Sequence, residues 1–264
     1  MAAETQYTAN TGVVAIATAN ANLDGTGTLG TVLIAAAVAG MLGCIIKSVT
    51  IKAQGNTTQG MVRLFVVGGG VTELIAEIEI PAVTKSTVDP TFEIYMETNY
   101  AIKVGYVLKA ATQNAETFNV IAEGLDWNYY TTSVRPESTK YIANTGLGQV
   151  STANTFRDGS GTFGNVLTAA SNGTNIQSVT IKATGSPAAG IVRLFIFDGT
   201  TNFLMSEIPV VATTQSGTAH SFSRRVLFGG NDFALKSGYL LRASTEIGNT
   251  FNVIAEGLDW TYPA

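Results

Sequence analysis

The feature that most constrains this chain is an internal repeat covering nearly all of its 264 residues. The stretch TFNVIAEGLDW at 117–127 recurs unchanged at 250–260, and SVTIKA at 48–53 recurs at 178–183. The offset between matching blocks is 134 residues near the start of the chain, 130 in the middle and 133 at the end. Insertions and deletions therefore fall between the blocks, where loops belong. Self-similarity of this kind predicts two copies of one folding unit in tandem.

The repeat sets the domain boundaries. We expect a first domain at 1–127, a polar linker at 128–139 and a second domain at 140–264. The segment 2–12 is polar and lacks strong periodicity, so an N-terminal arm is expected there. The apolar run 32–46 is shorter than the ~20 residues that a spanning helix needs. Because the second copy replaces it with Ser, Asn, Gly and Thr, it is predicted to be strand plus loop and not a membrane span.

Most blocks alternate between apolar and polar residues, which is the pattern of half-buried β-strands. In 49–52, for example, Val49 and Ile51 face one way, whereas Thr50 and Lys52 face the other. Each copy shows about eight such short strands, separated by Gly-rich turns, and no long stretch has helical spacing. The predicted fold is therefore all-β, a tandem duplication of two antiparallel jelly-roll or β-sandwich domains.

One hairpin can be registered in each copy. Arg63 is expected opposite Glu77 in the first domain, and Arg193 opposite Glu207 in the second. Opposite charges directly across antiparallel strands stabilise a sheet by about 0.2–1 kcal/mol. We therefore predict that these four residues form two structural ion pairs.

The same register places Phe65 opposite Ile75 and Phe195 opposite Met205 on one face of each hairpin. This face is too apolar for solvent, which suggests burial against another subunit or the other copy. Aromatic residues that end the last strand of each copy are expected to close the core or pack on a neighbouring subunit. The candidate interface residues are Phe65, Val67, Ile75, Phe195, Phe197, Met205, Trp127, Tyr129, Tyr130, Trp260 and Tyr262.

Composition disfavours several classes of function. Only 13% of the residues are charged, against about 25% in a typical soluble domain. A net charge of −4 offers no basic excess for nucleic acid or an anionic membrane. A single cysteine rules out an intrachain disulfide framework, and a single histidine removes most His-based catalysis and metal chemistry. We therefore expect no cofactor, no metal and no enzymatic activity, and a surface prone to association.

The few candidate reactive groups have structural interpretations. His220 is expected in a surface loop, and Cys44, in an apolar strand, is expected to be a buried, inert thiol. The carboxylate pairs Glu123/Asp126 and Glu256/Asp259 do not by themselves form a preorganised acid–base dyad. The motifs DGTG at 24–27 and DGSG at 158–161 favour Asp-capped turns, with a Ca²⁺ site as the alternative.

Together, the repeated blocks resemble a known family. The series SVTIKA, GxVRLF, EIP, GYxL and FNVIAEGxD resembles virion structural proteins of tailed bacteriophages, especially capsid decoration (cement) proteins with jelly-roll domains. The resemblance implies a non-enzymatic protein on the capsid surface of the virion, made in the host cytoplasm. It also implies that the partners are the major capsid protein and further copies of this chain, most simply as a homotrimer. Attachment would then rest on modest contacts multiplied by symmetry.

Two other functions stay open at this level. A receptor- or glycan-binding module of a phage fibre or tail would present Trp127, Trp260 and the neighbouring tyrosines in an exposed groove. A glycosidase on a β-sandwich would need two carboxylates across a cleft, for which the sequence gives little support.

Overall fold

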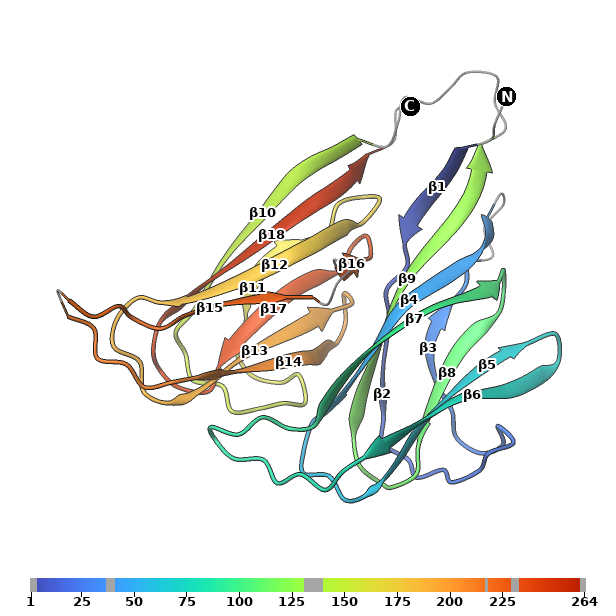
Figure 1. Cartoon of the computed structure of the whole chain (residues 1–264), viewed down its shortest axis with the longest axis horizontal. Helices are drawn as coiled ribbons and strands as arrows, with labels where there is room; N and C mark the ends of the chain where they lie inside the picture. The colour runs from blue at the N-terminus through green and yellow to red at the C-terminus, as the bar shows by residue number, and fades with distance from the viewer. Residues whose placement is uncertain (1–3, 37–40, 131–139, 217, 229–232, 262–264) are drawn as a thin grey trace.

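The computed structural model describes residues 4–36, 41–130, 140–216, 218–228 and 233–261 (Figure 1). These residues form eighteen β-strands and no helix, in four antiparallel sheets. Two sheets form each domain, and the two domains lie side by side, coloured blue to green and yellow-green to red in Figure 1. The fold is thus all-β, with two sandwich domains in tandem.

The first domain contains strands β1 to β9. One sheet has the order β1-β9-β4-β7, with β2 also pairing with β9, and the other has the order β3-β8-β5-β6. From β2 to β9 the chain passes back and forth between the two sheets, except at the β5–β6 hairpin, and such nested antiparallel pairing is that of a jelly roll. The strands are β1 (Glu4–Ala9), β2 (Gly12–Ile16), β3 (Gly30–Ile34), β4 (Met41–Ala53), β5 (Gly60–Gly68), β6 (Val71–Ile80), β7 (Glu93–Lys103), β8 (Val107–Thr112) and β9 (Phe118–Tyr130).

The second domain repeats this topology with strands β10 to β18. Its sheets have the orders β10-β18-β12-β15, with β16 also on β12, and β11-β17-β13-β14. The strands are β10 (Lys140–Val150), β11 (Gly164–Thr168), β12 (Thr174–Ala183), β13 (Gly190–Phe197), β14 (Asn202–Val210), β15 (Ser223–Leu227), β16 (Phe233–Leu235), β17 (Leu240–Thr245) and β18 (Phe251–Thr261).

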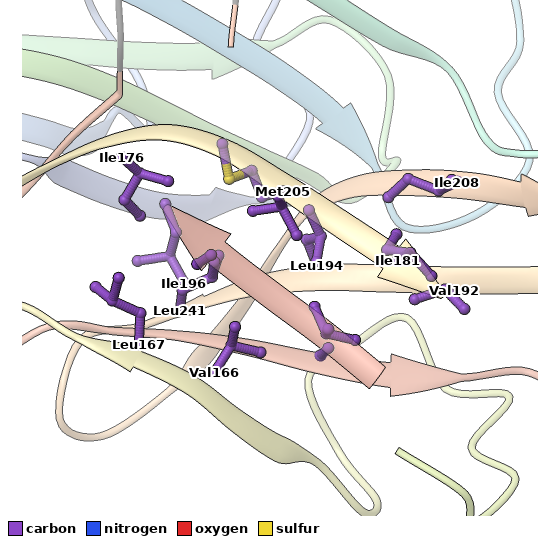
Figure 2. Packing of buried hydrophobic residues seen from close by; sticks show 14 of the residues in the cluster. Val166, Leu167, Ile176, Ile181, Val192, Leu194, Ile196, Met205, Ile208 and Leu241 are labelled. Atoms are coloured by element: carbon purple, nitrogen blue, oxygen red, sulfur yellow. The ribbon is translucent and has the colours of Figure 1, made fainter. Parts of the chain in front are cut away.

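Each domain has its own apolar core between its two sheets. The alternation seen in the sequence produces it, because every second side chain of a strand points to the same face. In the second domain, side chains from β11, β12, β13, β14 and β17 converge between the sheets (Figure 2). Burial of each large aliphatic side chain stabilises the fold by about 1.5–3 kcal/mol. The labelled core residues are Val166, Leu167, Ile176, Ile181, Val192, Leu194, Ile196, Met205, Ile208 and Leu241.

Two sequence-based boundaries differ from the structure, and a third segment agrees with its prediction. Residues 4–9 of the expected N-terminal arm form β1, which pairs with β9, because backbone hydrogen bonds can hold a polar segment that has no apolar pattern. The predicted linker 128–139 begins inside β9, which ends at Tyr130, and its residues 131–139 lie outside the described part of the chain. The apolar run 32–46 is divided between β3 and β4, as strand plus connection.

The two domains differ at one strand. The first domain has a continuous β7, whereas the second has β15 and β16 on the same side of β12. Phe228 precedes the interruption, and the rest of the sequence insertion, residues 229–232, lies outside the described residues. The short strand β16 contacts β9 of the first domain, so the interruption falls where the two domains meet.

Candidate functional site: the contact between the two domains

The domains meet through one edge and one face. Strand β14, at the edge of a sheet in the second domain, contacts β2, β4 and β9 of the first domain. The three contacted strands belong to one sheet, and β14 meets the face of that sheet opposite to the core of the first domain. An unpaired strand edge carries free backbone groups, so covering it removes a site of unwanted pairing.

Glu207 of β14 is the centre of this contact. Its Oε1 accepts from Arg193 Nε at 3.0 Å and from Arg157 Nε at 2.6 Å, both within the second domain. Its Oε2 lies 3.1 Å from Lys52 Nζ and accepts from the backbone N–H of Thr91 at 2.7 Å, both in the first domain. The Glu207 and Lys52 side chains are fully buried. One carboxylate therefore joins the two domains with every oxygen paired.

The charges around Glu207 balance. Lys52 also lies 3.3 Å from Glu93 Oε2, and Arg193 also pairs with Glu246. Three cations and three carboxylates thus form one network, which is buried except for the Glu93 side chain at 34% exposed. Burial by itself would raise the pKa of Glu207, but the charges of Lys52 and Arg157 and the Thr91 N–H lower it to about 2. Breaking such a network leaves an uncompensated buried charge.

Side-chain hydrogen bonds with the first domain occupy the edge of β14 that pairs with no other strand. Asn119 Nδ2, on β9, donates to the carbonyl of Leu204 at 3.1 Å. Ser206 Oγ donates to Glu93 Oε1 at 3.1 Å. An amide side chain thus takes the place that a neighbouring strand would occupy, which keeps a buried carbonyl satisfied.

A second set of hydrogen bonds fixes β16. Glu123 Oε1, on β9, accepts from the backbone N–H of Ala234 at 3.1 Å. Thr11 Oγ1 donates to the Ala234 carbonyl and accepts from the N–H of Lys236 at 3.0 Å. Because β16 is only three residues long, these bonds to the first domain complete its pairing.

Apolar packing completes the contact. Ile121 is 1% exposed and belongs to the core cluster of the second domain, against which Val13 also packs. Trp260 forms a small cluster with Ala234 and with Ala9 of the first domain. The core of the second domain therefore extends across the boundary to Ile121 of the first domain.

A small cavity remains beside this contact. It has a volume of about 170 Å³ and is lined by residues of both domains, among them Tyr95, Glu123, Met205 and Phe233. Its walls are mainly apolar side chains. A larger hollow of about 800 Å³ lies on the first domain alone, beside Glu79 and Pro81, and no aromatic side chain lines it.

The structure brings together both predicted ion pairs. Arg63 faces Glu77 in the strand register with Nε 2.9 Å from Oε1, and Arg193 faces Glu207 at 3.0 Å. The two pairs differ in environment. The Glu77 side chain is 42% exposed, whereas that of Glu207 is fully buried. The contacts of Glu207 with Lys52 and Arg157 were not predicted.

The aromatic part of the predicted register is wrong. Phe65 pairs with Leu74 instead of Ile75, because a β-bulge follows Leu64, and the same bulge places Phe195 opposite Leu204. A bulge adds one residue to one strand, so every later pairing shifts. Ile75 and Met205 consequently pack against the cores of their own domains.

The remaining candidate interface residues have varied environments. Phe65 and Phe195 are fully buried inside their own domains, and the Phe195 ring meets that of Phe163 at 4.8 Å. Val67 and Phe197 are half-buried, and the Arg242 guanidinium lies 3.5 Å above the Phe197 ring. Trp260 is buried at the domain boundary, and its counterpart Trp127 is half-buried against Gly43. The side chains of Tyr129 and Tyr130, and all of Tyr262, lie outside the described residues.

The candidate reactive groups are dispersed. Cys44 is fully buried, and burial raises the pKa of its thiol, with Asp126 adding to the effect. His220 is exposed. Asp126 accepts from Asn10 at 3.0 Å and Asp259 from Asn144 at 2.8 Å, so each has a local structural partner. Among the described residues, no group of three His, Cys, Asp or Glu side chains is arranged to hold a metal ion.

The repeated Asp-Gly motifs form turns. Asp24 accepts from the backbone N–H of Thr26 at 3.0 Å and from its hydroxyl at 2.7 Å, and these hydrogen bonds lower the pKa of Asp24. Gly25 and Gly27 have φ values of 76° and 82°, which side-chain-bearing residues rarely adopt. Asp158 makes the same bonds to Ser160.

The described part of the chain contains no helix with the length and hydropathy to cross a membrane.

Sequence comparison identifies no relative. No family model matches the chain, and no curated protein matches its sequence. Among solved structures, the chain is similar to the major capsid protein P2 from bacteriophage PM2, at 12% identity over 98% of both chains with a TM-score of 0.22.

Two other solved structures show a comparable likeness. The tandem CBM22 domain of Paenibacillus barcinonensis Xyn10C has 12% identity over 97% of this chain and 93% of that chain, with a TM-score of 0.22. The Macrobrachium rosenbergii nodavirus structure has 7% identity over 97% of this chain and 96% of that chain, with a TM-score of 0.21. Similarity at this level carries no argument about function, which must come from the chain's own residues.

Proposed function

We propose that this chain is a non-enzymatic structural protein of a virus particle, acting as a decoration protein that binds and stabilises a shell of major capsid protein. The observation that carries the proposal is the buried network around Glu207, which joins the two jelly rolls into one stiff block. A stiff block loses little conformational entropy when it binds, so a larger part of its contact energy is available for attachment.

The use of polar groups supports a structural role. The buried charged residues Lys52, Arg157, Arg193, Glu207 and Glu246 pair with one another. Catalysis would instead require a nucleophile, acid or base directed into a cleft. The strand blocks that resemble phage decoration proteins run through both domains, so the resemblance covers the whole block.

Exposed apolar side chains provide candidate attachment points. On β10, Tyr141, Ile142 and Leu147 are 58%, 56% and 73% exposed, and Leu227 of β15 is 67% exposed. Large exposed apolar side chains grouped on one sheet are typical of protein contact sites. They suit contacts with the major capsid protein and with further copies of this chain, for which a homotrimer is the expected assembly.

The test is to locate the chain on particles and then remove it. Antibody labelling of purified particles should mark the outer surface of the capsid. Particles made without the gene should release their DNA, detected with an intercalating dye, at a lower temperature than complete particles. Labelling confined to the tail, or absence of the chain from purified particles, would contradict the decoration role.

The glycan-binding alternative has less support. Trp260 is buried at the domain boundary, where no sugar ring can stack on it, and Trp127 is half-buried against Gly43. Binding on a glycan array, accompanied by a change in tryptophan fluorescence, would favour this alternative over the decoration role.

A further inference from the structure

The repeat gives the main residues of the interdomain contact counterparts in the other domain, and these counterparts take no part in the contact between the domains. The receiving face is the outer face of β2, β4 and β9 in the first domain, and the inserted edge is β14 in the second. Their counterparts are the open face, formed by β10, β12 and β18, and the open edge, which is β6. The open face belongs to the second domain and the open edge to the first.

The receiving face and the open face share one register. Lys52 pairs with Asn119 across β4 and β9, and Lys182 pairs with Asn252 across β12 and β18. The lysines are held alike, since Lys52 Nζ donates to the Thr91 carbonyl at 3.1 Å and Lys182 Nζ to the carbonyl at position 221 at 3.0 Å. The open face therefore presents its ammonium group at the position that, on the receiving face, meets Glu207.

The apolar parts of the two faces also correspond. Val13 pairs with Ile121 on the receiving face, and Leu147 pairs with Ile254 on the open face. Ile121 is 1% exposed because β14 and its neighbours cover it, whereas Leu147 is 73% exposed. The open face thus has a lysine at the same position and a corresponding aliphatic pair, in which Ile254 is half-buried and Leu147 is exposed.

The edges correspond as closely. Arg193 holds Glu207 on β14, and Arg63 holds Glu77 on β6, each through Nε to Oε1. Leu204 of β14 is fully buried, whereas its counterpart Leu74 is only half-buried. Within the described residues, β6 pairs on one side only, with β5, so its other edge is free. A free ten-residue edge is a ready template for contact with another chain.

Charge favours contact between these two open surfaces. The open edge carries Glu73, Glu77 and Glu79, all exposed. The open face carries Lys182, whereas Arg225 on the adjoining strand β15 already pairs with Glu256 of β18, so Lys182 is the cation that the open face offers to Glu77. Complementary charge of this kind selects a partner and speeds its association.

We propose that a second copy of this chain lays its β6 edge across the β10–β12–β18 face of the first copy, placing Glu77 of one copy beside Lys182 of the other. This contact between two chains would have the same arrangement as the contact between Glu207 and Lys52 within one chain. It does not depend on the virion role. Leu23, 53% exposed, occupies the position of Arg157 at this contact, which is therefore less ionic at its centre than the intrachain one.

Head-to-tail contact of this kind has a defined consequence for assembly. A heterologous interface leaves one free edge and one free face at the ends of every growing assembly, so it closes into a ring or extends as a filament. In a ring, every domain would insert its edge strand into the face of the next domain in the same direction around the ring, and each chain would contribute two consecutive domains. The expected homotrimer corresponds to a closed ring of six domains.

The test uses charge reversal in the full chain, measured by sedimentation velocity in low-salt buffer. The wild-type chain should associate beyond the monomer at micromolar concentration. E77K and K182E should each weaken association by about tenfold or more, because each places like charges face to face. The double variant E77K/K182E should restore it, since the pair is then present with its signs exchanged.

The control is K85E, which reverses an exposed loop lysine outside both open surfaces. It should associate like the wild type. Circular dichroism melting identifies any variant that fails to fold, and the double variant gives a positive result that misfolding cannot produce. A wild-type chain that stays monomeric, or assemblies that E77K and K182E leave unchanged, would overturn the proposal.

Discussion

Lys52 and Glu207 lie on different domains, 155 positions apart in the sequence, yet their charged groups are 3.1 Å apart and both side chains are fully buried. The sequence places Lys52 on the polar side of an alternating strand, where a solvent-facing lysine would be expected. Its burial results from the docking of the second domain. The predictions below separate this docking from the folding of each domain alone.

Glu207→Gln should destabilise the protein by about 3–5 kcal/mol, because it leaves Lys52, Arg157 and Arg193 buried beside a neutral amide. The matched change Glu77→Gln removes the equivalent carboxylate from a partly exposed pair and should cost about 0–1 kcal/mol. Urea unfolding followed by circular dichroism measures both. Equal losses for the two variants would show that the buried network does not stabilise the docked arrangement.

Stability should fall in acid because of the same carboxylate. The pKa of Glu207 is lowered to about 2 in the folded protein, and an unfolded glutamate has a pKa of about 4.3. A depressed folded-state pKa contributes stability above the unfolded value, and this contribution is lost as pH falls from about 4.3 toward about 2. Urea unfolding of the wild type and Glu207→Gln should therefore converge over this range. A constant difference down to pH 2 would contradict the assignment.

Ile121→Ala should cost about 2–5 kcal/mol, since it opens a cavity in the core that Ile121 shares with the second domain. Ile254→Ala alters the counterpart on the open face, where the side chain is half-buried, and should cost less. Both are measured by urea unfolding at concentrations where the chain is monomeric. A larger loss for Ile254→Ala would mean that the exposed and covered faces are assigned the wrong way round.

Thr11→Val should cost about 1–3 kcal/mol, because it removes the hydroxyl that bonds Ala234 and Lys236 and leaves buried backbone groups unpaired. Thr145 occupies the equivalent position on the open face and is exposed, so Thr145→Val should have little effect. Hydrogen exchange of the β16 amides provides a second measurement. Faster exchange is expected in Thr11→Val only.

The Cys44 thiol should react slowly with Ellman's reagent in the folded protein and rapidly in denaturant. It is fully buried, and burial raises its pKa, so little thiolate is present. Absorbance at neutral pH measures the reaction. Rapid modification without denaturant would indicate that the β4–β9 region opens frequently.

The sequence predicted the parts of the fold that depend on local pattern. Alternation located the strands, and the position of the Gly-rich turn at 68–70 set the register that brings Arg63 to Glu77. The bulge after Leu64 escaped prediction because nothing in the local sequence marks it, and β1 escaped because its pairing with β9 uses the backbone. Contacts of Lys52 with the other domain are not a property of its strand at all.

One signal in the sequence could have indicated the docking surface. At the position where the first copy has Leu23, the second copy has Arg157. This arginine lies beside Arg193 and Glu207, an ion pair whose equivalent is present in the first copy as well. A cation added next to an already paired carboxylate suggests that further charge is being balanced there. Comparison of the two copies position by position therefore carries information that neither copy holds alone.

The packing of Ile121 into the core of the second domain has a practical consequence for anyone dividing this protein. A cut at the sequence boundary of the repeat would expose Ile121 and Val13 on one fragment and strip the cover from Leu204 and Met205 on the other. Neither fragment would have the surface of a finished domain. The two halves should therefore be expressed together as one chain. Tags or insertions should be placed in loops that make no contact with the other domain.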